Sequence, residues 1–271
     1  MKAARVSLNS NGGLADLASL SNEKGECLLN QYTFHGQIGR GCATSVYIVR
    51  DVDGAKACKL ARRRPNMRWS KLVKTFRHES LLLQRCVHPN IVEYHGLYLS
   101  STEAALVLGL APDGDCQQLL LRHGPRTETA AGSIMSQLCV ALDFLHQVQR
   151  VLHRDVKLEN VLVCEYDHSS GYQKIKLCDF GHSCLMDEPL LGSAVDDGFK
   201  GTEGYVAPEV ASGGLWTPAA DVWSAGVVFY ALLANELLRW KAPDVPDIFS
   251  NTSRAFAKVS SAHPCVWLAL L

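Results

Sequence analysis

The sequence lacks several features that would place a protein in a class at once. Its formal net charge is zero, so no excess of positive charge favours nucleic acid or an anionic membrane as a partner. Its ten cysteines are scattered without a C-x-x-C pair, which argues against a zinc site and a small disulfide scaffold. No apolar run reaches the roughly 20 residues of a spanning helix, and none follows Lys2 and Arg5 as in a signal peptide. We therefore expect a protein of the cytoplasm, with the nucleus as the second possibility.

The composition is that of a globular protein with a core, since 47% of the 271 residues are apolar and 20% are charged. Residues 1–30 are rich in Ser, Asn, Gly and Ala without sustained periodicity, so we expect a flexible extension or loosely attached segment. After Tyr32 the pattern predicts β-strands at 32–38, 46–51, 55–60, 105–110, 161–164 and 175–177. Amphipathic helices are predicted at 70–86 and 130–147.

The stretch VLHRDVKLENVLV at 151–163 sets charged and polar residues between two runs of aliphatics. Asp155, Lys157 and Asn160 combine an acid that can take a proton, a cation that can neutralise charge and an amide oxygen that can bind a metal. The flanking aliphatic residues can anchor such a loop between packed elements. A solvated loop between two strands is the alternative interpretation.

HRDVKLEN resembles the catalytic loop of eukaryotic protein kinases, H-R-D-x-x-x-x-N, with the lysine two residues after the aspartate that serine/threonine members carry. The resemblance implies a two-lobed α+β fold. Its N-lobe is a small antiparallel β-sheet with one main helix, and its C-lobe is mainly helical and incomplete at its C-terminal end. The implied boundaries are a kinase domain at 31–271, with the N-lobe at 31–110, the hinge at 109–115 and the C-lobe at 112–271.

The segment GRGCATS joins the first two predicted strands. Gly39 and Gly41 let the backbone approach a phosphate closely because no Cβ stands in the way. A lone G-x-G is more often a hairpin turn. The resemblance to the kinase pattern G-x-G-x-x-G-x-V, with Val46 in place, implies a nucleotide-binding loop. Thr44 replaces the third glycine, a departure that would stiffen the loop or change nucleotide affinity.

Lys59 alone would be interpreted as an exposed strand lysine. The predicted helix at 70–86, however, repeats buried-type residues at spacings of four, three, four and three, which mark one helical face. These residues are Leu72, Phe76, Glu79, Leu83 and Cys86. A carboxylate on that face is costly unless it is paired, so Glu79 is predicted to pair with Lys59. The pair resembles the kinase lysine–glutamate pair that holds the α- and β-phosphates of ATP.

The resemblance also assigns the rest of the nucleotide site. Leu108 falls at the gatekeeper position, the backbone of 109–111 faces adenine, and Asp115 falls where the family meets the ribose hydroxyls. Composition alone would call the PDGD segment a turn. The further residues implied to bind nucleotide are Ile38, Val46, Ala57, Leu110 and Leu162.

Two later motifs complete the resemblance. Asp179 opens D-F-G, and the family binds Mg²⁺ with this aspartate and with the loop asparagine, here Asn160. GTEGYVAPE matches G-T-x-x-Y-x-A-P-E, and the family threonine, here Thr202, hydrogen-bonds the catalytic aspartate and lysine. Thr202 and Lys157 both indicate the serine/threonine class. ATP and Mg²⁺ are therefore the expected cofactors.

Two features near the C-terminus carry expectations of their own. Asp221 heads an all-apolar predicted helix, where an aspartate can cap backbone amides and, in the family, braces the catalytic loop. The family arginine that pairs with the glutamate of A-P-E cannot be found after Glu209. An unpaired carboxylate there would cost about 1–3 kcal/mol if it were buried.

The expected function is ATP-dependent phosphorylation of serine or threonine hydroxyls on a protein substrate. Glu159 resembles the acid with which basophilic kinases bind an upstream arginine, so basic substrates are expected. The hinge and the apolar helix resemble the calmodulin-dependent kinase group. A pseudokinase acting as a nucleotide-binding or scaffold module is the alternative; a small-molecule kinase should lack A-P-E and G-T-x-x-Y.

Regulation and docking are predicted from charge. Arg154 usually pairs with an activation-segment phosphate in the family, so an upstream kinase is a possible partner, with Ser183 and Ser193 as candidate acceptors. Asp196 and Asp197 already supply negative charge there. A basic run surrounds the helix at 70–86 and is interpreted as a solvated face, with a docking site for an acidic partner as the alternative. It consists of Arg62, Arg63, Arg64, Arg68, Lys71, Lys74 and Arg77.

Overall fold

The computed structural model divides the chain into two compact units, each described by itself. The sheet unit comprises Met1–Val87 and Val92–Leu110, and the helical unit comprises His88–Ile91 and Ala111–Leu271. The residues that the structure describes are 20–22, 25, 27–41, 43–167, 172–187 and 201–236. The expectations for the shortened end of the C-lobe and for Ser193, Asp196 and Asp197 lie outside these residues.

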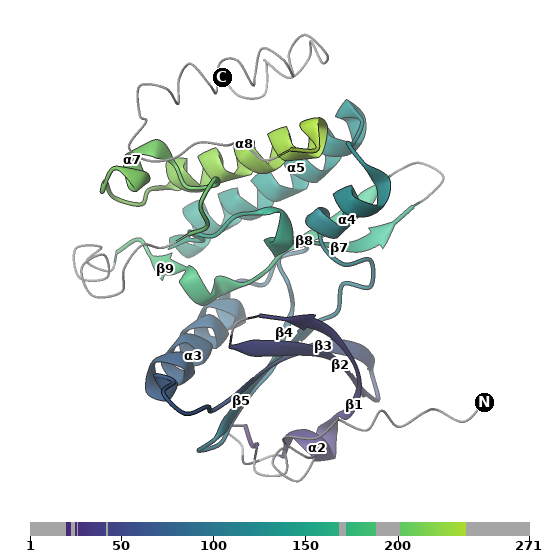
Figure 1. Ribbon diagram of the computed structural model, residues 1–271, viewed down its shortest axis with the longest axis vertical. Helices are drawn as coiled ribbons and strands as arrows, with labels where there is room; N and C mark the ends of the chain where they lie inside the picture. The colour runs from purple at the N-terminus through teal and green to yellow at the C-terminus, as the bar shows by residue number, and fades with distance from the viewer. Residues whose placement is uncertain are drawn as a thin grey trace. The chain divides into compact units, whose positions relative to one another are not determined.

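The sheet unit is built on five antiparallel strands (Figure 1). Their order across the sheet is β1 (Thr33–Arg40), β2 (Thr44–Asp51), β3 (Gly54–Arg62), β5 (Glu103–Gly109) and β4 (Tyr94–Leu99). The turn between β2 and β3 is closed by Asp51, whose Oδ1 accepts the N–H groups of Asp53 and Gly54 at 2.9 and 3.0 Å. The first three predicted strands are confirmed within two residues at each end, whereas β4 was not predicted.

Helix α3 (Trp69–Arg85) packs against β4 and β5. It buries Phe76, Glu79, Leu82 and Leu83, in agreement with the predicted apolar face, although Leu72 stays partly exposed. The inward carboxylate therefore lies where the periodicity placed it.

The other face of the sheet is covered by a segment that we call the N-terminal strap, residues 20–22 and 27–32, which includes α2 (Leu28–Gln31). Leu20 and Leu28 are fully buried in a cluster with side chains of the sheet. Ser21 and Leu99 exchange two backbone hydrogen bonds, at 2.8 and 3.4 Å. The expectation of a loosely attached segment is therefore wrong for these residues, because two leucines bury themselves on the sheet. Residues 1–19, 23, 24 and 26 lie outside the description.

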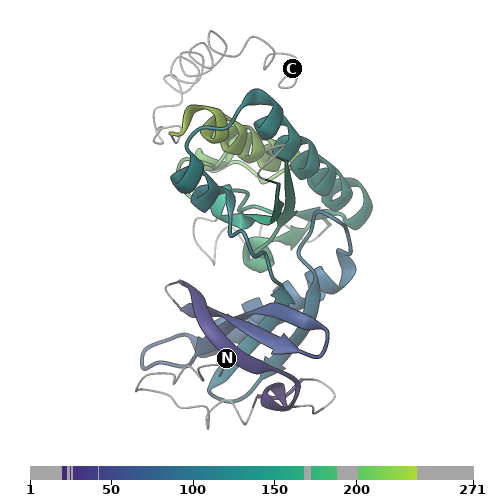
Figure 2. The ribbon, with the colours of Figure 1, turned by 90° about the vertical axis from the view of Figure 1, so that its right-hand side faces the viewer.

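The helical unit is built around two long helices, α5 (Glu128–Asp143), which continues as a π-helical turn at Phe144–Gln149, and α8 (Pro218–Ala234). They lie side by side in both views (Figures 1 and 2). Two shorter helices accompany them, α4 (Cys116–His123) and α7 (Pro208–Ala211). Helix α8 is buried almost all round, as its sequence predicts.

Two small antiparallel ladders flank the catalytic-loop motif of the helical unit. One pairs β6 (Val151–Leu152) with β9 (Cys184–Leu185), and the other pairs β7 (Val161–Tyr166) with β8 (Gln173–Leu177). A short 3₁₀ turn at Leu158–Asn160 ends the loop, and another at Phe180–His182 follows the D-F-G aspartate. Together with the sheet unit, this arrangement confirms the predicted α+β class. None of the described helices is long and apolar enough to cross a bilayer.

Candidate active site

The loop at 153–160 is held by a buried aspartate of α8. Asp221 is fully buried, and its carboxylate accepts the backbone N–H groups of His153 and Arg154, each at 2.8 Å. It also lies 2.9 Å from Nε2 of His146, which must donate because a carboxylate only accepts. The expected brace of the loop is present. The expected cap is not, because α8 begins at Pro218 and Asp221 lies inside its first turn.

Two side chains of this loop and one from a distant segment form a closed triangle of hydrogen bonds. Lys157 Nζ lies 2.7 Å from Asp155 Oδ2 and 2.8 Å from Thr202 Oγ1, and the Thr202 hydroxyl donates to Asp155 Oδ1 at 2.7 Å. Asn160 Nδ2 adds a bond to Asp155 Oδ2 at 3.1 Å. The structure therefore brings together four of the predicted site residues of the helical unit.

The loop is also tied to the residue before D-F-G. Cys178 donates its N–H to Asn160 O at 2.9 Å, and Cys178 O lies 3.0 Å from Nε2 of His153. Since a carbonyl accepts, His153 Nε2 donates, and its Nδ1 accepts the N–H of Asp155 at 3.3 Å. Burial lowers the pKa of His153, which agrees with a neutral ring that donates through one nitrogen and accepts through the other.

Asp179 follows in the left-handed region, at φ 62° and ψ 76°. A non-glycine residue is uncommon there and persists only where its surroundings hold it. Phe180 is fully buried, and its ring packs edge to face on His153 with centroids 5.0 Å apart. The buried phenylalanine thus fixes the backbone that presents the Asp179 carboxylate.

In the sheet unit, Lys59 and Glu79 form the predicted ion pair. Lys59 Nζ lies 3.0 and 3.2 Å from the two carboxylate oxygens of Glu79, which is fully buried, while the lysine side chain is 21% exposed. The ammonium also lies 5.9 Å from the ring centre of Phe76. The pair holds the lysine on the α3 side of β3.

Strand register sets a further group of predicted residues on the Lys59 side of the sheet. Val46 pairs with Gly39 on one side and with Lys59 on the other, and Ala57 pairs with Leu108. Because side chains alternate along a strand, Val46, Ala57, Lys59 and Leu108 share one face. The predicted nucleotide-facing residues of the three strands are therefore neighbours.

The glycine loop is closed by the residue that replaces its third glycine. Gly41 N–H donates to Thr44 O at 2.8 Å, and a Cβ on Gly41 would lie 3.2 Å from Thr44 Oγ1. Ile38 is 47% exposed, so it is available to a ligand. The hydrogen bond uses the backbone oxygen of Thr44, so stiffening of the loop by its side chain stays a prediction.

The predicted ribose residue sits at the start of α4. Asp115 Oδ1 accepts the N–H of Gln118 at 2.8 Å as an N-cap, and its backbone forms a bridge with Leu162. Burial raises the pKa of Asp115; the Gln118 N–H opposes this and the nearby Glu159 carboxylate adds to it. Leu110 is half-buried at the last position of the sheet unit. The turn and the binding interpretation are thus compatible.

The predicted magnesium ligands are Asn160 and Asp179. Among the described residues, no group of three or more His, Cys, Asp or Glu side chains could hold a metal by itself. Asn160 Nδ2 donates to Asp155 O at 2.7 Å, which leaves its amide oxygen as the atom it can offer to a cation. One amide oxygen and one carboxylate fit an ion that takes its other ligands from phosphate oxygens and water.

One regulatory expectation needs correction, and the condition of one stability expectation is not met. Ser183 is 2% exposed and donates its hydroxyl to His153 O at 3.2 Å, so it is not an accessible phosphate acceptor here; Arg154 Nε instead donates to His182 O at 2.6 Å. Glu209 is exposed, so the predicted cost of a buried carboxylate does not arise.

Two residues that position the site were not found from the sequence. His146 and His153 support the loop through Asp221, Asp155 and Cys178. Their signal was weak: His153 belongs to the matched motif but carried no assigned role, and His146 resembles any core histidine.

Comparison with known proteins gives a consistent result. Residues 32–263 match the family described as protein kinase domain. The chain is 37% identical over 158 residues to a calcium/calmodulin-dependent protein kinase type 1 of Macrobrachium nipponense, covering 58% of this chain and 43% of that protein. It is 30% identical to calcium/calmodulin-dependent protein kinase type IV of Rattus norvegicus, and the match covers 80% of this chain and 43% of that protein. It is 31% identical to CBL-interacting serine/threonine-protein kinase 7 of Arabidopsis thaliana, covering 86% and 51%. The chain therefore spans about half or less of each of these relatives.

Proposed function

The chain belongs to the protein kinase family, and from that premise we propose that it transfers the γ-phosphoryl group of ATP to serine or threonine hydroxyls of a protein. Its similarity to calmodulin-dependent and CBL-interacting kinases agrees with the resemblance stated from the sequence. Because the chain spans only part of these relatives, the activity rests on the geometry of its own residues.

The observation that carries the proposal is the number of hydrogen bonds that the Asp155 carboxylate already accepts. A carboxylate offers about four lone-pair sites. Three are used, by Thr202, Lys157 and Asn160. About one site is thus left for a substrate hydroxyl, in a carboxylate whose orientation is already held by three donors. Because these donors already orient the carboxylate, little reorganisation is needed when the hydroxyl arrives.

Each residue has a role in the proposed transfer. The Asp155 carboxylate orients the hydroxyl and accepts its proton. Lys157 offsets charge on the transferred group, and Thr202 keeps lysine and aspartate together. Lys59, held by Glu79, contacts the α- and β-phosphates, while Gly39 and Gly41 allow the backbone to approach them. Asn160 and Asp179 would hold Mg²⁺, which would neutralise phosphate charge.

Replacement of Asp155 by Ala tests the assignment. We expect turnover of a mixed peptide library with ATP and Mg²⁺ to fall by about 10²–10⁴-fold, because a positioned base contributes that much. The affinity for ATP should stay within about twofold, since the phosphate-binding residues are intact. Asp143→Ala, on an exposed position of α5, is the matched control and should leave turnover unchanged.

Unchanged turnover in the Asp155→Ala variant would contradict the assignment of Asp155 as the residue that accepts the proton. Nucleotide binding by the wild type without turnover on any peptide would instead favour the alternative, a pseudokinase that acts as a binding or scaffold module.

We also propose a preference for basic residues upstream of the target. Glu159 is exposed, and it lies near enough to Asp115 to raise the pKa of that carboxyl, so two acids are available to a cationic side chain. Glu159→Gln should lower the kcat/KM ratio for arginine-containing over neutral peptides by about twofold to fivefold. Asp143→Asn removes the same charge elsewhere and should not change the ratio. A peptide array in which acidic flanks are preferred would contradict the proposal.

A further inference from the structure

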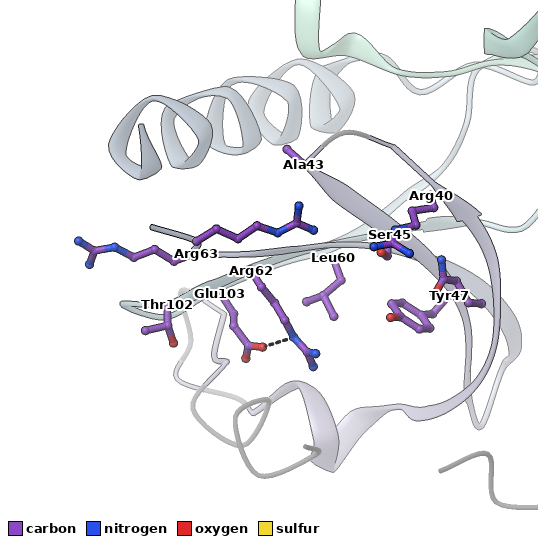
Figure 3. A pocket seen from close by; sticks show the side chains of 11 residues that line it. Arg40, Ala43, Ser45, Tyr47, Leu60, Arg62, Arg63, Thr102 and Glu103 are labelled. Carbon is purple, nitrogen blue, oxygen red and sulfur yellow. Dashed lines mark hydrogen bonds and ion pairs between the residues drawn. The ribbon is translucent and has the colours of Figure 1, made fainter. Parts of the chain in front are cut away.

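A groove of about 610 Å³ lies on the sheet unit (Figure 3). Leu60 and Arg62 line it, and because neighbours on a strand point to opposite faces they turn away from the face that carries Lys59. Tyr47 and Leu60 belong both to the groove wall and to the core under the N-terminal strap. The groove is thus separate from the proposed nucleotide-binding face.

The wall of the groove is strongly cationic. Its charged side chains are Arg40, Arg62, Arg63, Arg64 and Glu103. Among the described residues that line the groove there are four arginines and one carboxylate, although the chain as a whole has no net charge. Ser45, Thr102 and Gln37 add neutral hydrogen-bonding groups. Positive charge is therefore concentrated at this groove, and the overall composition of the chain does not account for it.

One arginine carries a hydrogen-bond donor that the described residues leave unused. Arg62 Nε donates to Glu103 Oε1 at 2.8 Å, and Glu103 is 2% exposed, so the guanidinium is fixed in place (Figure 3). Its Nη2 is buried from solvent and has no hydrogen-bond partner within the described part of the chain. A buried donor without a partner is unfavourable, and an acceptor atom of a bound ligand would satisfy it.

The guanidinium groups in the groove wall indicate which kind of ligand the groove would bind. Guanidinium groups bind phosphate through two parallel N–H donors, which makes clustered arginines well suited to phosphoryl groups. A concave site of this volume suits a side chain with its flanking residues. A nucleic acid or an anionic membrane would be expected to engage a broader basic surface, and the zero net charge favours neither.

We propose that this arginine groove docks a phosphoserine- or phosphothreonine-containing segment of a partner protein. Arg63 and Arg64 are exposed and meet the phosphate first, and Arg62 completes its coordination with the buried Nη2. Three members of the basic run are thereby assigned to a docking site rather than to a solvated face. The proposal goes beyond the proposed function, since it uses no residue of the catalytic loop and requires no turnover.

The test measures binding by fluorescence anisotropy without nucleotide. The probes are a degenerate peptide library with a fixed phosphoserine, the same library unphosphorylated, inorganic phosphate, and phosphatidylcholine vesicles containing a phosphoinositide. We expect the phosphorylated library to bind at least about tenfold more tightly than its unphosphorylated counterpart. Neither inorganic phosphate nor the vesicles should bind comparably.

Two variants locate the site. Arg63→Gln with Arg64→Gln should weaken phosphopeptide binding by about tenfold. Arg62→Lys keeps a cation beside Glu103 but removes the buried donor, and it should weaken binding by a similar factor. Lys74→Gln with Arg77→Gln removes the same charge from exposed positions of α3 and should change affinity by less than about twofold. Melting temperatures check that every variant is folded.

Equal affinity for both libraries, an equal loss in the α3 control, or binding to phosphate or vesicles alone would each overturn the proposal. Weaker phosphopeptide binding in both groove variants, with both variants folded, supports the proposal. Peptide phosphorylation by the Arg63–Arg64 variant should be retained, so failure of docking is distinguishable from failure of catalysis.

Discussion

Thr202 and Asp155 are joined by a hydrogen bond of 2.7 Å in which the threonine hydroxyl donates to Oδ1, although 47 positions separate the two residues. Lys157 contacts both partners, so a loop and a distant segment form one rigid group. The orientation of the proposed catalytic carboxylate therefore depends on how the chain returns at Gly201 and Thr202.

Replacement of Thr202 by Val removes the hydroxyl while keeping the shape of the side chain. We expect kcat to fall by about 10²-fold, because small misplacements of a catalytic group have effects of that size. Thr202→Ser keeps the donor and should retain most activity. Steady-state kinetics at saturating ATP provide the measurement, and equal kcat values for the Val variant and the wild type would contradict the role.

The Lys59–Glu79 pair should show strong energetic coupling. Glu79 is fully buried, so removing the lysine leaves a carboxylate deprived of its cation, whereas removing both charges does not. In a cycle of Lys59→Met, Glu79→Met and the double variant, we expect a coupling energy of about 1–3 kcal/mol. Urea unfolding measures it. Additive effects would show that the pair does not stabilise the sheet unit.

Stability should decrease as the pH falls because of His153. Burial lowers the pKa of His153 in the folded state, so below about pH 6.5 the unfolded chain takes up a proton that the folded protein does not. The contribution of His153 is therefore present above that pH and lost as the pH falls toward the folded pKa.

The pH effect is measured from unfolding free energies at about pH 7.5 and pH 5.5. The His153→Gln variant should have a lower unfolding free energy than the wild type at the higher pH. Its unfolding free energy should decrease less than that of the wild type between the higher and the lower pH. Burial also lowers the pKa of His88 and His95, so the loss of stability at low pH should be reduced in the His153→Gln variant and not abolished. His123→Gln is the control, at an exposed position, and a wild-type decrease in both variants would refute the role of His153.

Gly201 should not tolerate a side chain. Its φ is +91°, and a Cβ would lie 2.7 Å from Val206 Cγ2 and 3.3 Å from Arg154 O. Gly213 has a φ of +89° with nothing near its Cβ position, so it shares the strain without the contact. Gly201→Ala should therefore cost more than Gly213→Ala, by about 1–3 kcal/mol in thermal unfolding. Similar costs would mean that the neighbours of Gly201 move aside freely.

Leu28 tests whether the N-terminal strap belongs to the core. The side chain is fully buried, so Leu28→Ala should destabilise the protein by about 2–4 kcal/mol. Val52→Ala, at a fully exposed position, should change stability by less than about 0.5 kcal/mol. If the two variants unfolded at the same denaturant concentration, the strap would not contribute to stability.

Some of these relationships were predictable and others were not. Helical periodicity placed the Glu79 carboxylate on the buried face, where it needs a partner, and the resemblance to kinases indicated Lys59 as that partner. The brace by Asp221 was implied by resemblance, yet its helix was expected to begin at the aspartate, and a preceding Thr-Pro step starts it earlier. The burial of Leu20 and Leu28 could not be predicted, because two isolated leucines in a polar segment show no period.

Short contiguous motifs were sufficient to identify the protein kinase family and to predict the loop acid and the magnesium ligands, because phosphoryl-transfer chemistry restricts residue type and spacing within a few positions. The tertiary structure alone decided which distant groups meet: Thr202 with Asp155, His146 with Asp221, the strap with the far face of the sheet, and Arg40 with Arg62–Arg64 around one groove. Sequence patterns report the environment of near neighbours, whereas these contacts arise from strand register and helix packing between segments that no local pattern connects.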